Sequence, residues 1–451
     1  MPGRTGFLRT SNMNRPLPHP RASRPHLALA IGATLLASAL LPAHAAEPAK
    51  ATVPAPVPVL AVKAARLIDV RDAKVIEAPV VLIEGERIKA VGKNLTIPEG
   101  ARVLDLGDST LLPGLVDFHV HLGGFGPRIG TARGALAGAK QARDTLEAGF
   151  TSLRNMGGKA FTGIALRDAI KEGDIPGPRI YDAGTLLTTT GGHCSGQVTT
   201  PEEDQDGPGV ANGADAFERK VRQQFKYGAD FVKVCITGGF MSGTDPRVTQ
   251  FSEEELKSVI DTAHRYRKKV AVHAHGADGI RLAAQLGADS IEHASLVDEE
   301  GLKLLKQKQI PVVPTLAIDS LAQEHAVEAG ASAYTLAILK QTATLHKQNI
   351  AKAIKAGIPI IYGTDAPITP HGTNAVEFHY LVEAGLTPLQ AIQAATLTPA
   401  RWLDAADDIG SIEAGRFADI IAVKNDPLAD IRVLEHVQWV MKGGVVYKNA
   451  L

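Results

Sequence analysis

The residues best suited to chemistry begin with two histidines, His119 and His121, separated by one valine in the stretch LLPGLVDFHVH. Residues two apart in a β-strand point to the same side, so both imidazoles should face one way. Two neutral imidazoles at one strand end form half of a metal site, and zinc favours nitrogen ligands. For this pair alone, a strand whose histidines are satisfied by hydrogen bonds is an equally good interpretation.

Further polar residues stand at the ends of later apolar runs. They are Lys233 in ADFVKVCI, His273 and His275 in VAVHAHG, His293 in SIEHAS and Asp365 in YGTDAP. An unpaired polar group inside an apolar strand costs a few kcal/mol. Such a series, repeated from strand to strand, indicates a metal-dependent active site better than a set of unrelated structural residues.

Lys233 is the least ordinary member of this series. It shares one strand face with Phe231 and Cys235, so its amine is expected to be buried. Burial lowers the pKa of an ammonium group. A neutral amine can add carbon dioxide and become a carbamate, whose two oxygens can bridge two metal ions. The alternative is a lysine paired with a carboxylate.

The elements that must position these residues alternate regularly. From DFHVH to GTDAP there are eight strand candidates, each followed by helical sequence. The predicted helices cover 132–148, 161–173, 214–227, 252–268, 276–286, 298–308 and 331–356. Eight repeats favour an α/β fold with a closed (β/α)8 TIM-like barrel over residues 113–405, with reactive groups at the carboxyl ends of the strands. A doubly wound open sheet is the alternative.

The regions on either side of the predicted barrel have a different sequence pattern. Residues 60–112 and 406–451 contain short β-branched runs separated by turn residues. We expect them to form one small β-sandwich domain built from both ends of the mature chain.

The first 45 residues resemble a Sec-type signal peptide, with a basic start, a short apolar core and Ala43-His44-Ala45. Cleavage is expected after Ala45, which predicts a periplasmic or secreted protein; a retained membrane anchor is the alternative. Residues 46–59 read as a Pro/Ala-rich linker.

The 48 basic and 48 acidic residues balance, which gives no indication of a nucleic-acid partner. Cys194 and Cys235 are expected to be buried free thiols, although they could pair in an oxidising compartment.

Taken together, PGLVDFHVH, ADFVKVCITGG, VAVHAHG, SIEHAS, YGTDAP and the tail GLTPLQAIQAATLTPAR…DIGSIEAGRFADIIAV resemble the amidohydrolase superfamily. The likeness is greatest to its imidazolonepropionase-related branch of prolidase-like, carboxypeptidase-like and ochratoxin-hydrolysing enzymes. The resemblance implies two zinc ions per subunit. Its implied ligands are His119, His121, carboxylated Lys233, His273, His293 and Asp365. It also implies a homo-oligomer, with an octamer as one form.

The chemistry follows from those ligands. A metal-bridging hydroxide would attack the amide carbonyl, and Asp365 would take its proton and pass it to the leaving amine. His275 is a candidate to hydrogen-bond the substrate, or else a histidine that only supports the ligands. His193, in a long Gly-rich loop, and Arg247 are candidates for binding a substrate carboxylate; a solvated arginine is the alternative for Arg247.

The leading hypothesis is therefore a dinuclear zinc amidohydrolase that acts on N-acyl amino acids or dipeptides with a free carboxylate, including ochratoxin A. A mononuclear deaminase or cyclic-amide hydrolase on the same scaffold is the alternative, which Lys233 argues against. A third hypothesis is a non-catalytic periplasmic binding protein, which would hydrolyse no such amide.

Overall fold

The computed structural model describes residues 59–123, 130–195, 209–240, 244–328 and 332–451. The chain divides into two compact units, residues 1–55 and 56–451, and the described residues all belong to the second. The predicted signal peptide and nearly all of the predicted linker lie outside the described residues. No helix in the described ranges is both long and apolar enough to cross a membrane.

Seven parallel strands form the centre of the second unit. They make two sheets, of order β10-β9-β8 and β11-β12-β13-β14. The strands are β8 (Leu115–Val120), β9 (Phe150–Asn155), β10 (Arg179–Asp182), β11 (Val232–Cys235), β12 (Val270–Ala274), β13 (Ser290–His293) and β14 (Val312–Val313). An α/β fold with parallel strands is thereby confirmed.

Backbone bridges connect these two sheets at both of their edges. Leu187, beyond β10, pairs with Val234 of β11. The predicted eighth strand is an extended segment with isolated bridges rather than a continuous strand. Its Ile360 pairs with Val312 of β14 and its Ala366 pairs with Val120 of β8.

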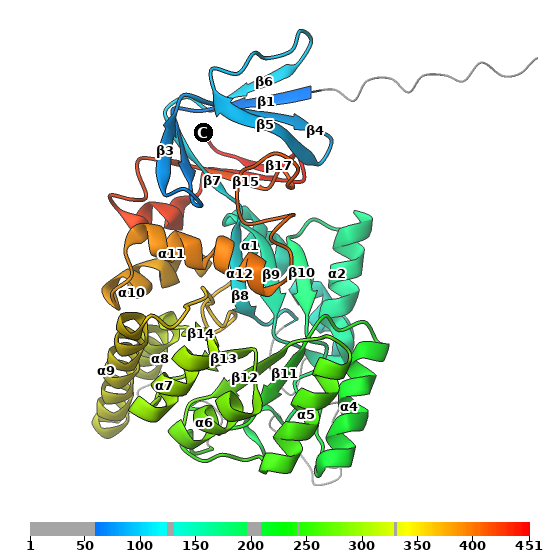
Figure 1. Ribbon diagram of the computed structural model, residues 1–451, viewed down its shortest axis with the longest axis vertical. Helices are drawn as coiled ribbons and strands as arrows, with labels where there is room; N and C mark the ends of the chain where they lie inside the picture. The colour runs from blue at the N-terminus through cyan, green and yellow to red at the C-terminus, as the bar shows by residue number, and fades with distance from the viewer. Residues whose placement is uncertain (1–58, 124–129, 196–208, 241–243, 329–331) are drawn as a thin grey trace, which may run out of the picture. The chain divides into compact units, whose positions relative to one another are not determined.

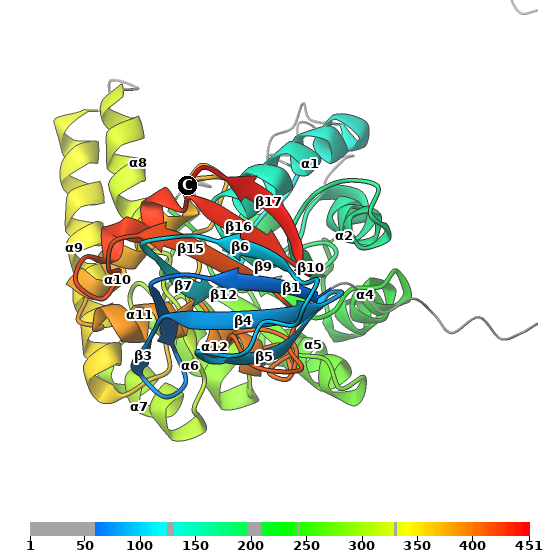
Figure 2. The same cartoon turned by 90° about the horizontal axis from the view of Figure 1, so that it is seen from above.

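Helices lie outside the parallel strands in both views (Figures 1 and 2). Seven of them match the predicted helices to within a few residues at each end: α1 (Thr131–Glu147), α2 (Thr162–Glu172), α4 (Ala214–Lys226), α5 (Glu253–Arg265), α6 (Ala277–Leu286), α7 (Glu299–Lys308) and α9 (Ala333–Ala356). The shorter α10 (Glu377–Glu383), α11 (Pro388–Ala394) and α12 (Leu397–Trp402) follow. Local sequence explains several starts: at α5, Ser252 and Glu255 form a reciprocal capping box.

Helix α8 (Ala317–Glu328) was not predicted. Its sequence, AIDSLAQEHAVE, has no clear apolar stripe, and only Ala317 is fully buried. It lies beside α9, and the two helices stand together in Figure 2.

Strands from both ends of the described chain share one of the remaining sheets, of order β17-β16-β15-β7-β2-β3, whereas the other, of order β5-β4-β1-β6, contains N-terminal strands alone. The strands are β1 (Val59–Lys63), β2 (Arg66–Asp69), β3 (Lys74–Glu77), β4 (Pro79–Glu84), β5 (Arg87–Lys93), β6 (Arg102–Asp105), β7 (Ser109–Pro113), β15 (Ile420–Lys424), β16 (Trp439–Lys442) and β17 (Val445–Asn449). One apolar cluster draws side chains from both sheets, among them Val62, Ile83, Ile420 and Trp439.

The passage from β7 to β8 places the first two histidines. Gly114 stands between these strands, and a Cβ atom there would lie 2.0 Å from Thr151 Oγ1. Only glycine leaves room here for the side chain of Thr151. The turn therefore brings DFHVH directly from an outer sheet into the parallel strands.

Candidate active site at the carboxyl ends of the parallel strands

The structure brings all seven strand-end residues together. His119 lies in β8, Lys233 in β11, His273 in β12 and His293 at the end of β13. His121 and His275 directly follow β8 and β12, and Asp365 directly precedes the bridge residue Ala366. All seven are buried, with exposed fractions between 1% and 8%. Grouped buried polar side chains of this kind are typical of functional sites.

Two triads within this group have the composition of metal sites. His119, His121 and Asp365 form one, and His273, His275 and His293 form the other; within each, the ligand atoms lie within 4.8 Å of one another. Asp365 Oδ1 is 3.4 Å from His119 Nε2 and 3.3 Å from His121 Nε2. The rings of His119 and His293 are 5.0 Å apart, so the two triads are neighbours.

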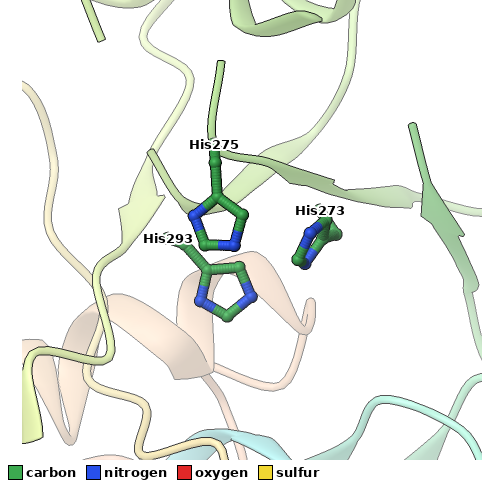
Figure 3. A group of neighbouring side chains, drawn as sticks. All are labelled: His273, His275 and His293. Carbon is green, nitrogen blue, oxygen red and sulfur yellow. The ribbon is translucent and has the colours of Figure 1, made fainter. Parts of the chain in front are cut away.

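The second triad adds His275 to the residues that could ligate a metal (Figure 3). Its ring stacks on that of His293 at 4.8 Å between centroids, and it meets the ring of His273 edge-on at 4.6 Å. The sequence predicted a substrate contact or a supporting role for His275. The geometry also permits direct metal ligation.

Four of these histidines are oriented by a hydrogen bond at the ring nitrogen Nδ1. Nδ1 of His119 donates to Glu292 Oε2 at 2.8 Å, and Nδ1 of His121 donates to the carbonyl of Gly157 at 3.0 Å. His293 uses Nδ1 in the same way, with Thr315 Oγ1, whereas His275 Nδ1 lies 2.9 Å from Ser295 Oγ, a hydroxyl that can either accept or donate. The bonds of His119, His121 and His293 make Nε2 the ligand atom of these rings, as is usual for metal-binding histidines.

The protonation states also fit metal binding, which requires neutral imidazoles. Burial lowers the pKa of His119 to about 4, and burial lowers the pKa values of His273, His275 and His293 well below the usual range. For Asp365, burial would raise the pKa, but His119 and His121 outweigh it and lower the pKa of this carboxyl group. The carboxylate is therefore ionised and ready to ligate.

Lys233 is buried, with 1% of its surface exposed. Burial lowers the pKa of its amine to about 8, although the carboxylates of Glu292 and Asp365 act in the opposite direction. Within the described part of the chain no carboxylate lies within 4 Å of Lys233 Nζ, so the alternative of a simple ion pair is not realised. Its positive charge helps to lower the pKa values of His119, His273 and His293, which belong to both triads.

A buried ion pair between Glu292 and Arg154 contacts His119. The sequence did not predict this ion pair. Glu292 Oε1 accepts hydrogen bonds from Arg154 Nη2 at 2.6 Å and from Ser290 Oγ at 2.7 Å, while Oε2 faces His119. Arg154 also lies over the ring of Phe118 at 3.7 Å. Arg154 and His119 lower the pKa of Glu292 to about 2, against the effect of burial. The signal was present as charged residues inside apolar strands, in FTSLRN and SIEHAS.

A pocket opens from the second triad toward α8 and α9 and encloses about 700 Å³, including its mouth. Five apolar side chains line the wall: Phe240, Ile318, Ala322, Leu339 and Ile368. Asp319, Thr342 and His346 are the polar residues that α8 and α9 add to it. A mostly apolar pocket with a few polar groups beside a metal site is a typical small-molecule site.

Comparison with known proteins decides the family. The model of the Amidohydrolase family matches residues 110–447. The chain belongs to the amidohydrolase family. The resemblance inferred from the strand-end motifs is thereby confirmed.

Individual relatives narrow the branch. Ochratoxinase from Aspergillus niger is 35% identical over 413 residues, which cover 84% of each chain; its crystal structure matches with a TM-score of 0.76, covering 88% of this chain and 96% of that chain. A crystal structure of a Xaa-Pro dipeptidase with bound methionine in the active site is 36% identical, with a TM-score of 0.82, covering 87% of this chain and 100% of that chain. Imidazolonepropionase from Fusobacterium nucleatum is 24% identical over 414 residues, covering 82% and 91% of the two chains. This amidohydrolase is therefore a hydrolase of amide or peptide C–N bonds.

The two predicted carboxylate-binding residues have different positions in this amidohydrolase. His193 begins the short helix η2 (His193–Ser195), lines the pocket and stacks on His273 at 4.4 Å between ring centroids. Arg247 is 76% exposed, its guanidinium is paired with Asp245 at 2.6 Å, and it does not line the pocket. The structure thus brings His193 to the site and leaves Arg247 outside it.

The expectation of free thiols was wrong, because Cys194 and Cys235 form a disulfide with a Cα–Cα distance of 6.0 Å. The two residues are 41 positions apart, and only the tertiary fold brings η2 against the end of β11. The disulfide ties the turn that carries His193 to the strand that carries Lys233.

Proposed function

We propose that this amidohydrolase is a dinuclear zinc enzyme that cleaves the amide bond of N-acyl amino acids or dipeptides with a free carboxylate, including ochratoxin A. The observation that carries the proposal is the buried amine of Lys233, close to two triads of ligands and without a carboxylate within 4 Å among the described residues. The names of the related ochratoxinase and Xaa-Pro dipeptidase support the substrate class.

The donor set fits two zinc ions. His119, His121 and Asp365 would hold one, His273 and His293 would hold the other, and a carboxylated Lys233 would bridge them. Zinc bound there would supply Lewis acidity, which activates water near neutral pH and polarises a carbonyl group.

The side chains divide the remaining work. Asp365 would accept the proton of the attacking water and deliver it to the nitrogen of the leaving amine. His275, which lines the pocket, would donate a hydrogen bond from Nε2–H to the substrate carbonyl, with its Nδ1 accepting from the hydroxyl of Ser295. His193 would contact the substrate carboxylate, and the apolar wall would exclude water from the reacting groups.

The same proposal extends to the fold. We infer that the parallel strands close into a (β/α)8 barrel and that the two outer sheets pack as a β-sandwich. The bridges Leu187–Val234, Val312–Ile360 and Val120–Ala366 support closure, and the apolar cluster shared by the outer sheets supports the sandwich.

A hydrolysis panel tests the proposed reaction. Purified protein would be assayed on N-acyl amino acids, dipeptides and ochratoxin A, before and after complete removal of metal with a chelator and again after zinc is added back. We expect release of the free amino acid, loss of release without metal and recovery with zinc. Turnover that survives complete removal of zinc would contradict the mechanism.

A further inference from the structure

One pair of polar residues, Asp319 of α8 and His346 of α9, has no part in the chemistry proposed above. Asp319 Oδ2 lies 2.8 Å from His346 Nδ1, and His346 Nε2 lies 3.0 Å from the carbonyl oxygen of His293. His346 is only 2% exposed. Both of its ring nitrogens face acceptor oxygens of the protein, so this ring has no donor left for a substrate.

Asp319 is different, because one of its oxygens remains for a ligand. Its side chain is 21% exposed and lines the pocket, and Oδ1 has no hydrogen-bond partner among the described residues. The same wall contains the apolar side chains of Ile318, Ala322 and Leu339, and Thr342 is its other polar residue besides His346. This oxygen is accessible from the pocket, so a bound molecule with a donor can take the place of water there.

The charge of the described pocket lining shows which kind of group fits. The lining contains no lysine or arginine, and its carboxylates are Asp319 and Asp365. The wall formed by α8 and α9 therefore suits a cation or a hydrogen-bond donor and disfavours the carboxylate of the substrate. With that carboxylate directed elsewhere, the acyl half of the amide is the part that faces Asp319.

We propose that Asp319 is a specificity-determining residue that binds an α-ammonium group on the acyl half of the substrate, held in position by His346. This inference rests on the proposed amide hydrolysis and deepens it. Among amides with a free carboxylate, the preferred class is then the dipeptide with a free amino terminus rather than the N-acyl amino acid.

Two test substrates differ only in the α-ammonium group on the acyl half. L-alanyl-L-phenylalanine and propionyl-L-phenylalanine share the carbon skeleton, the scissile bond and the leaving amine, but only the first has the α-ammonium group. We expect the wild-type kcat/KM to favour alanyl-phenylalanine by about 10- to 100-fold, as a charge-assisted hydrogen bond would give. In Asp319→Asn this ratio should fall to about threefold or less, mainly through KM, with little change on propionyl-phenylalanine. Glu324→Gln removes an exposed acid of the same helix and should leave the ratio unchanged.

Inhibition of the wild-type enzyme provides a second measurement that needs no variant. Alaninamide should inhibit the hydrolysis of propionyl-phenylalanine at a concentration at least tenfold lower than propionamide does. Hydrolysis of both test substrates at equal kcat/KM by the wild type, or an equal loss on both in Asp319→Asn, overturns the role of Asp319 but leaves the proposed function standing. Hydrolysis of neither test substrate by the zinc-loaded enzyme overturns the proposed function itself.

Discussion

At the scale of single residues, the orientation of His119 depends on a charge buried deep among the parallel strands. Glu292 fixes the ring through Nδ1 and is itself held by Arg154 and Ser290. Partners of this kind determine ligand basicity and direction, and their loss commonly lowers metal affinity by about 10- to 100-fold.

Glu292→Gln should therefore lower zinc affinity by about 10- to 100-fold, because the amide cannot replace the carboxylate that faces His119 Nδ1. Competition with a chelator of known affinity measures this. Ser290→Ala is the control, since Ser290 bonds the other oxygen of Glu292, and it should retain zinc. Unchanged zinc affinity in Glu292→Gln would show that this ion pair supports folding only.

The sequence predicted the residues at strand ends and missed their supports. Alternation along a strand reveals His119, Lys233 and His273 one by one, because each is polar within an apolar run. The pairing of Arg154 with Glu292 joins β9 to β13, and no local pattern shows that two strands so distant in sequence bring their charges together. The grouping of His275 with His273 and His293 likewise needs the distances between rings.

At the scale of elements, the disulfide between η2 and β11 gives a prediction for the double variant Cys194→Ser/Cys235→Ser. Removing a cross-link that closes a loop of 41 residues should lower the free energy of unfolding by about 4 kcal/mol. Freeing the turn that carries His193 should also raise KM more than it lowers kcat. Thermal unfolding with and without reductant measures the first effect, and the double variant should not respond to reductant. Two titratable thiols in the untreated, denatured wild-type protein would contradict the pairing.

Asp182, the last residue of β10, should make the free energy of unfolding depend on pH. Burial raises the pKa of Asp182 from 3.8 to about 7, despite hydrogen bonds from Asn155 and Gly184. Because the folded pKa is the higher one, the contribution of this group is fully present below about pH 4 and is lost as the pH rises through about 7. The loss amounts to up to about 4 kcal/mol.

Asp182→Asn should therefore flatten the dependence of the unfolding free energy on pH between about 4 and 7. Denaturant unfolding across this range provides the measurement. Asp174→Asn, at an exposed site shortly after α2, should keep the wild-type slope. Equal slopes in Asp182→Asn and the wild type would contradict the assignment to Asp182.

Elements with strong local signals were predictable, and those without were not. Helices α5 and α7 begin directly after Ser252 and Asp298, whose side chains cap the first turn. Helix α8 lacks a clear apolar stripe, and several of its residues line the pocket instead of the core, so no helical period marks it in the sequence. The segment 358–367 reads as a strand, but only Ile360 and Ala366 form bridges to neighbouring strands.

At the scale of the whole molecule, export and assembly remain predictions. Expression of the full chain in a host with Sec export should give a protein whose first residue is Ala46, as N-terminal sequencing would show. The disulfide supports an oxidising compartment. Retention of residues 1–45 in a membrane fraction would favour an anchor instead. Light scattering of the purified protein should give a homo-oligomer, up to an octamer, and a monomeric mass would contradict that expectation.

The central claim is that Lys233 makes this a two-metal hydrolase, and counting zinc in the purified protein tests it most directly. The wild type should contain about two zinc ions per subunit. Lys233→Ala, and Lys233→Met as the variant that preserves side-chain volume, should contain one or fewer and lose amide hydrolysis. A single zinc ion per subunit, unaffected by either substitution, would contradict the dinuclear mechanism.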